Sequence, residues 1–74
     1  MKITYDAATD TLTVVLRDAP ARIEEKSGMI LDYDADDRLI ALEVLDASAR
    51  VDGVDTVQLQ VIPKPGAKQP AAAE

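Results

Sequence analysis

The chain has 74 residues and a net charge of −6, and it contains neither histidine nor cysteine. The absence of both residue types excludes ordinary zinc sites, thiol catalysis and Ser-His-Asp chemistry, and the negative charge opposes contact with nucleic-acid phosphate or an anionic membrane. No segment approaches the roughly 18 apolar residues that span a bilayer, so we expect a cytoplasmic protein whose partners include neither nucleic acid nor membrane.

The hydrophobic inventory is too small for a thick core. Tyr5 and Tyr33 are the only aromatic residues, and phenylalanine and tryptophan are absent. A chain of this size buries only about 60% of the surface of its unfolded form, and small domains short of core commonly depend on disulfides, metals or oligomerisation. Because cysteine is absent, we expect a homo-oligomer, either a dimer or a larger assembly.

The first part of the chain predicts a β-hairpin. Apolar residues alternate with polar ones on both sides of a loop rich in turn formers at residues 7–10. Placing Tyr5 opposite Leu12 and Ile3 opposite Val14 gathers the apolar side chains on one face. Pro20 then breaks the strand because proline has no N–H to donate to a sheet, and residues 22–26 are expected to form a third extended piece.

A second hairpin is predicted over residues 29–45, with its return strand at 39–45. Its register collects six apolar residues on one face through three facing pairs, which are Tyr33 with Ile40, Leu31 with Leu42, and Met29 with Val44. This pairing leaves Asp36-Asp37 as a two-residue turn, for which type I′ with positive φ at both residues is usual.

The remaining residues predict one short helix, one strand and a tail. Asp46 suits a helix N-cap and Gly53 a helix stop, so a helical turn is expected between them. Residues 57–61 alternate apolar and polar, which is typical of a final strand, and Pro63 ends it. We predict one domain at residues 1–62 and a flexible Pro/Ala-rich tail at 63–74. The expected fold class is mainly β (α+β), a small antiparallel β-meander of four to five strands with one short helix.

The stretch from residue 32 to residue 43 is similar to a calcium loop. Its acids fit the template D-x-[DN]-x-[DN]-G-x5-E, except that Asp37 stands where the template has glycine. A wrapped EF-hand site needs flanking helices, which the strand pattern excludes. In the hairpin register, however, Asp32 and Asp34 share the outward face and Glu43 lies diagonal to Asp32. These three carboxylates are the candidate ligands for a loosely held Ca²⁺ or Mg²⁺, and the competing interpretation is an ordinary solvated sheet face.

The same outward face also carries apolar residues, which favours an interface over open solvent. The candidate interface residues are Ile30, Leu39, Ala41 and Leu45. A second copy of the chain is the simplest cover for such a face. Catalysis is disfavoured because only carboxylates are available and so short a chain has little material for a pocket of roughly 300 Å³. We therefore predict no enzymatic activity, no catalytic residue and no cofactor.

Four segments of the chain are similar to a known family. They are Met1-Lys2-Ile3-Thr4-Tyr5-Asp6, Thr9-Asp10-Thr11-Leu12, Gly28-Met29-Ile30-Leu31-Asp32-Tyr33-Asp34 and Leu42-Glu43-Val44-Leu45-Asp46-Ala47-Ser48. Together they resemble the domain of unknown function 2283 family of small bacterial proteins. The chain departs from the family at Asp37, where members usually carry glycine, and has no family counterpart from Asp52 onward. The resemblance implies a compact β-rich fold and no recognised catalytic motif.

The function predicted from these observations is that of a small acidic, non-catalytic protein-interaction module that associates with itself. The resemblance adds that such genes look like frequent neighbours of small toxin-like reading frames, which implies an antitoxin-like or accessory role toward a basic protein partner. The alternative is a weak Ca²⁺- or Mg²⁺-binding protein that uses the outward acidic face of the 29–45 hairpin.

Overall fold

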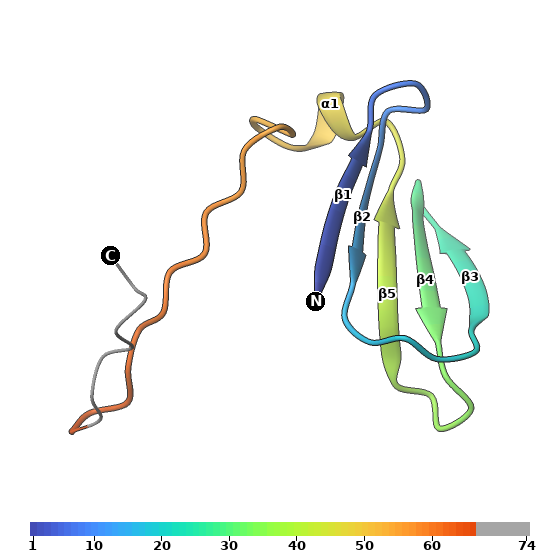
Figure 1. Ribbon diagram of the computed structural model, residues 1–74. Helices are drawn as coiled ribbons and strands as arrows, with labels where there is room; N and C mark the ends of the chain where they lie inside the picture. Colours follow the sequence, from blue (N-terminus) through green and yellow to red (C-terminus); the bar gives the residue numbers. More distant parts are fainter. Residues whose placement is uncertain (67–74) are drawn as a thin grey trace.

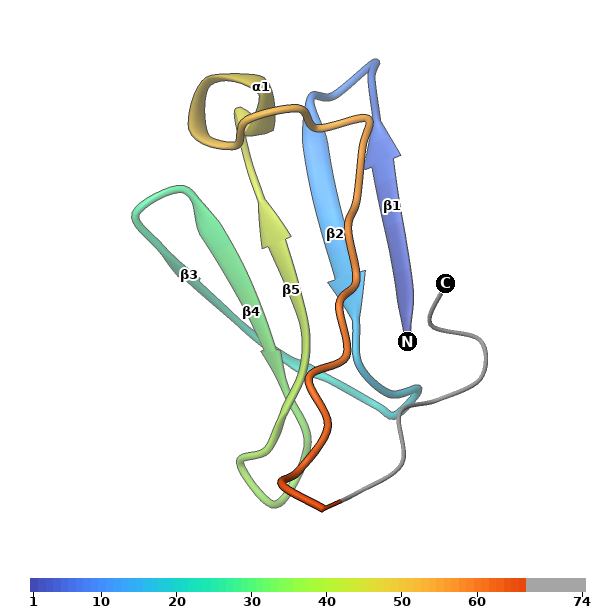
Figure 2. The same cartoon turned by 90° about the vertical axis from the view of Figure 1, so that its left-hand side faces the viewer.

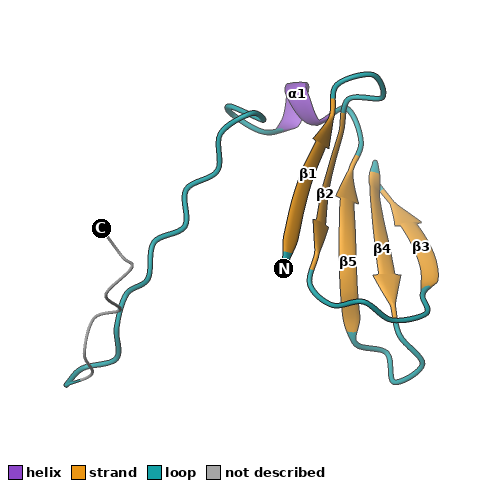
Figure 3. Ribbon diagram, viewed as in Figure 1, coloured by secondary structure: helices purple, strands orange, loops and turns teal. Residues whose placement is uncertain are grey.

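The computed structural model describes residues 1–66, and these residues form one antiparallel sheet with a single short helix (Figure 1, Figure 3). The elements are β1 (Lys2–Asp6), β2 (Thr11–Val15), β3 (Arg22–Lys26), β4 (Met29–Tyr33), β5 (Leu39–Val44) and α1 (Ala47–Arg50). The predicted fold class is therefore confirmed. No helix within the described residues is both long and apolar enough to cross a membrane.

The strands lie in the order β1-β2-β5-β4-β3, which Figure 2 shows face-on. Two units with local connections make up this sheet, the hairpin β1-β2 and the three-stranded β3-β4-β5. They join where β5 pairs with β2. The link between β2 and β3 passes along one end of the sheet, where the backbone N–H groups of Leu16 and Arg17 donate to the carbonyl of Ile40 at 2.8 and 3.2 Å.

The register predicted for the first hairpin is confirmed. Ile3 faces Val14 and Tyr5 faces Leu12. Within the connecting loop, the Asp6 carboxylate accepts the N–H of Ala8 at 2.9 Å, an Asx turn. The alternation of apolar residues was enough to specify this pairing because a shift by one residue would reverse every side chain.

The register of the second hairpin agrees with the prediction at two of its three pairs. Met29 faces Val44 and Leu31 faces Leu42, but Tyr33 faces Leu39, and a bulge at this point leaves Ile40 as the extra residue. The predicted pair of Tyr33 with Ile40 is therefore wrong. An extra residue in one strand strengthens the local twist, and here it accompanies the burial of Ile40, which is only 3% exposed.

The predicted two-residue turn is also wrong, because the loop holds three residues, 35–37. The N–H of Asp37 donates to the Asp34 carbonyl at 3.1 Å, and the N–H of Asp34 donates to the Arg38 carbonyl at 2.9 Å. Asp37 has a φ of 61°, whereas Asp36 is not left-handed. This loop requires one residue at positive φ instead of two, which is less costly for a sequence without glycine here.

The predicted short helix is confirmed as α1, although Asp46 makes no side-chain capping bond. The strand predicted at 57–61 is wrong, since residues 57–66 lie outside the sheet and are exposed. Alternation of apolar and polar residues shows which side of a strand would be apolar, but it does not show whether another strand is available to pair with the segment. The predicted tail begins within this exposed part, and its residues 67–74 lie outside the described residues.

One side of the sheet is apolar over four of its five strands. We call it the apolar face, and the register places on it Ile3, Tyr5, Leu12, Val14, Met29, Leu31, Tyr33, Leu42 and Val44. The opposite side, the mixed face, carries Thr13, Val15, Ile23, Ile30, Asp32, Ala41 and Glu43. Within the described chain only three hydrophobic residues are buried, namely Ile40, Ala41 and Ala47. The sheet is thus a single layer.

Candidate functional site

The Asp34 carboxylate organises the end of the sheet where β4 turns into β5. Its Oδ1 accepts the backbone N–H groups of Asp36 and Arg38, each at 2.9 Å, and its Oδ2 accepts the Arg38 Nε at 2.9 Å. Arg17 Nη1 lies 3.9 Å from Oδ2. The Asp34 side chain is only 9% exposed. Asp34 therefore links the turn, the return strand and the link that follows β2.

These donors keep Asp34 ionised. The hydrogen bond from the Arg38 backbone is the main cause that lowers the pKa of this carboxyl, helped by the Asp36 N–H and the Arg38 side chain, while burial acts in the opposite direction. A carboxylate whose oxygens are occupied in this way is poorly suited to act as a general acid or as a metal ligand. Its observed role is to fix the turn.

The structure does not bring the three candidate metal ligands together. Asp32 and Glu43 lie on the mixed face, where Asp32 faces Ala41 and Glu43 faces Ile30, but Asp34 is engaged in its own turn. The Asp32 Oδ1 is buried and has no hydrogen-bond partner in the described part of the chain. Within residues 1–66, no group of three acidic side chains is placed to hold a metal ion. Cation binding stays a prediction without geometric support.

A second cluster, whose bonds between distant residues the sequence did not predict, forms at the opposite end of the sheet around Asp10. The Tyr5 hydroxyl donates to Asp10 Oδ1 at 2.8 Å, the Ser48 N–H to the same oxygen at 2.9 Å, and the Ser48 hydroxyl to Oδ2 at 2.7 Å. The Ala47 N–H also donates to the Asp10 carbonyl at 2.9 Å. Asp10 thus caps α1 from a distant loop and attaches the helix to the first hairpin.

The pKa values in this cluster follow from its hydrogen bonds. The Ser48 hydroxyl is the main cause that lowers the pKa of Asp10, followed by Tyr5. The same bond to Asp10 is the main cause that raises the pKa of Tyr5. Both shifts favour the observed pairing of a neutral phenol with a carboxylate. No local sequence pattern predicts this cluster, because Asp10 and Ser48 are 38 residues apart in the chain.

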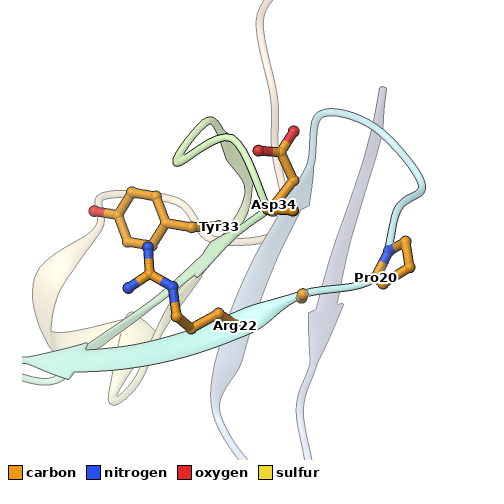
Figure 4. Close-up of a pocket in the computed structure, with 6 residues that line it drawn as sticks. Pro20, Arg22, Tyr33 and Asp34 are labelled. Atoms are coloured by element: carbon orange, nitrogen blue, oxygen red, sulfur yellow. The ribbon is translucent and has the colours of Figure 1, made fainter.

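A small hollow of about 270 Å³ lies beside the Asp34 turn. Its walls are Pro20, Ala21, Arg22, Tyr33, Asp34 and Ala35, and Figure 4 shows the Arg22 and Tyr33 side chains together in it. The Arg22 guanidinium carbon is 5.2 Å from the centroid of the Tyr33 ring, a cation–π contact. Arg22 also pairs with Asp37 and Glu24. The hollow is smaller than ordinary ligand pockets, and its only acid, Asp34, is committed to the turn.

The candidate interface residues occupy varied environments. Ala41 is buried within the chain at 7% exposure, so it has little surface to offer. Ile30, Leu39 and Leu45 are half-buried, and their role at an interface stays a prediction. On the apolar face, Ile3 is 37% exposed and the other eight residues are half-buried. Alternation in the sequence predicts that this side is apolar, but it cannot tell whether a second layer lies over it.

The fold and these clusters define a small single-sheet antiparallel β protein whose clustered polar side chains maintain turns and helix attachment. Comparison with protein families makes the assignment more specific: the chain belongs to the family described as protein of unknown function (DUF2283), whose model matches residues 2–48. The suspected family is thereby confirmed. The match includes β1 to β5 and the start of α1. No curated protein and no solved structure matches the chain.

Proposed function

We propose that this protein is a non-catalytic interaction module that associates with a second copy of itself through the apolar face. One observation carries the proposal: nothing within the described residues forms a second layer over that face. Two cross-strand rows cross it, Ile3-Val14-Leu42-Leu31 and Tyr5-Leu12-Val44-Met29. Stable domains pack a sheet against another layer, and a second sheet with the same apolar face is a suitable one.

The surface area supports this proposal. The chain exposes 6001 Å², about a third more than the roughly 4,400 Å² expected for a compact chain of its mass. Residues 57–66 are exposed and contribute to the excess, and a single-layer sheet also exposes more surface than a sheet packed against a second layer.

The two faces of β1 offer a matched test. Ile3 lies on the apolar face, is 37% exposed and belongs to an edge strand, and its neighbour Thr4 points to the mixed face. In a symmetric dimer, Ile3→Lys removes the burial of two isoleucines. At about 1–2 kcal/mol each, the dissociation constant should rise roughly 30- to 700-fold, whereas Thr4→Lys should change it little.

Light scattering and sedimentation over a range of concentrations measure this constant, with circular dichroism to verify that both variants fold. We expect the parent protein to form a dimer or a larger assembly. A parent that is monomeric up to millimolar concentration would overturn the proposal. Equal effects of the two lysine substitutions would place the interface elsewhere.

The antitoxin-like role toward a basic protein is a separate proposal. It is supported by the family resemblance and by the net charge of −6. Co-purification with the product of a neighbouring gene tests it. Failure to bind any such product would count against this role and would leave self-association unaffected.

A further inference from the structure

Residues 57–62, which we call the arm, form an extended segment with uncovered apolar side chains. Val57, Leu59, Val61 and Ile62 are 60, 80, 45 and 82% exposed. The last backbone hydrogen bond before the arm joins the Thr56 N–H to the Gly53 carbonyl, and the structure gives residues 57–66 none within the described chain. The arm is therefore an extended segment with apolar side chains, and its backbone groups have no hydrogen-bond partner among residues 1–66.

The composition of the arm is that of a strand with one buried side. Val57, Leu59 and Val61 alternate with Gln58 and Gln60, and no charge occurs from residue 56 to residue 63. A solvated linker would be rich in charged or small residues. An uncharged segment can also approach a protein of net charge −6 without repulsion. These features indicate that the arm packs against a protein surface.

The arm does not pack on its own sheet. Figure 1 shows the chain leaving α1 and running apart from the strands, and in Figure 2 it crosses in front of the sheet. A facing sheet packs about 10 Å away, which brings a second copy within the reach of the arm.

The two free edges of the sheet differ in their suitability for the arm. The β3 edge presents charged residues at four of its five positions, Arg22, Glu24, Glu25 and Lys26, a pattern that protects an edge from pairing. The β1 edge alternates polar residues with Ile3 and Tyr5, both on the apolar face. A strand of six residues spans about 20 Å, which is enough to cover the roughly 17 Å of the five-residue β1.

From this complementarity we infer that the arm of one copy adds as a strand along the β1 edge of a second copy, reciprocally in a symmetric dimer. Val57, Leu59 and Val61 then extend the apolar face beyond Ile3 and Tyr5. Gln58 and Gln60 point to the mixed face beside the polar side chains of β1. The added strand also satisfies backbone groups of both segments, as in other cases of strand addition. This inference depends on the proposed self-association.

Substitutions on the two sides of the arm test the exchange. Burial of one leucine is worth about tenfold to a hundredfold in affinity, and a symmetric dimer contains two arms. Leu59→Lys should therefore raise the dimer dissociation constant at least about a hundredfold, and Gln58→Lys should change it less than tenfold. If both variants dimerise like the parent, the exchange is refuted while self-association stands. If the parent itself is monomeric, both proposals fall.

Engineered disulfides distinguish exchange from pairing within one chain, and the lack of native cysteine makes the result unambiguous. Thr4 and Gln60 are on the same side of the proposed six-stranded sheet. After mild oxidation, the Thr4→Cys/Gln60→Cys and Thr4→Cys/Gln58→Cys variants should give a covalent dimer on a non-reducing gel. A closed monomer would show that the arm completes its own sheet and would overturn the inference. The Glu25→Cys/Gln60→Cys control, which places the first thiol on β3, should form neither product efficiently.

Discussion

The turn between β4 and β5 holds Asp37 in the left-handed region, with a φ of 61°. Replacement by glycine and by alanine gives a matched pair, because both remove the Arg22–Asp37 ion pair of 2.6 Å and differ only in backbone preference. Alanine at positive φ costs roughly 1–2 kcal/mol. Glycine avoids that cost, although its greater conformational freedom in the unfolded chain cancels about 0.4–1 kcal/mol of the stability gained. We expect Asp37→Gly to be more stable than Asp37→Ala by about 1 kcal/mol.

The parent protein should fall between the two variants. Aspartate tolerates the left-handed region better than alanine, and its exposed ion pair with Arg22 contributes little. For a chain of this size, 1 kcal/mol corresponds to a difference in Tm of about 4–8 °C. Thermal unfolding followed by circular dichroism measures this difference. All samples are kept at one protein concentration, because the proposed self-association would raise Tm by mass action. Equal Tm values for the two variants would refute the strain argument.

Three further predictions concern the polar clusters. Asp34→Ala should destabilise the protein more than Asp34→Asn, because asparagine keeps an oxygen that accepts the N–H groups of Asp36 and Arg38. Chemical denaturation measures both variants. The opposite order of stability would contradict the role of Asp34 in fixing the turn. The free energy of unfolding should fall as the pH decreases through the lowered pKa values of Asp34 and Asp10. A carboxyl group with a lowered pKa in the folded state stabilises that state above the pKa of the unfolded chain, which is about 3.9 for aspartate. An Asp34→Asn/Asp10→Asn variant with an unchanged profile of Tm against pH would disprove this. Ser48→Ala should increase amide hydrogen exchange in α1 while leaving the strands protected, and uniform loss of protection would argue against a local role.

Much of the sheet could be predicted from alternation alone. The pairs Ile3 with Val14 and Leu31 with Leu42 were specified because each places apolar side chains on one side. The bulge at Ile40 could not be predicted, since it depends on a three-residue loop whose geometry the Asp34 carboxylate determines. The position of β5 between β2 and β4 could not be predicted either. Local patterns identify a strand and its hairpin partner, but they do not show which other strand pairs with its second edge.

The polar sites were harder to predict for a different reason. Asp34 was singled out by its spacing with Asp32 and Asp36, but such spacing describes both a cation ligand and a turn whose carboxylate binds backbone N–H groups. Its burial and its bonds to Arg38 decide in favour of the turn. The bond between Asp10 and Ser48 required the fold itself, because it joins a hairpin loop to a helix far along the chain.

The strand order has a consequence for how the chain folds. Among the strands that the structure describes, β2 with β5 is the pairing that is not formed by neighbours in sequence, since it brings Val15 to Ala41 and Leu12 to Val44. The other pairings close short loops and form early, whereas this one closes a long loop at a higher entropic cost. The β1-β2 hairpin and the β3-β4-β5 unit are thus expected to form first, and their docking should limit the folding rate. Until they dock, β2 and β5 each expose an open edge, so this is the stage at which the chain is most prone to aggregation.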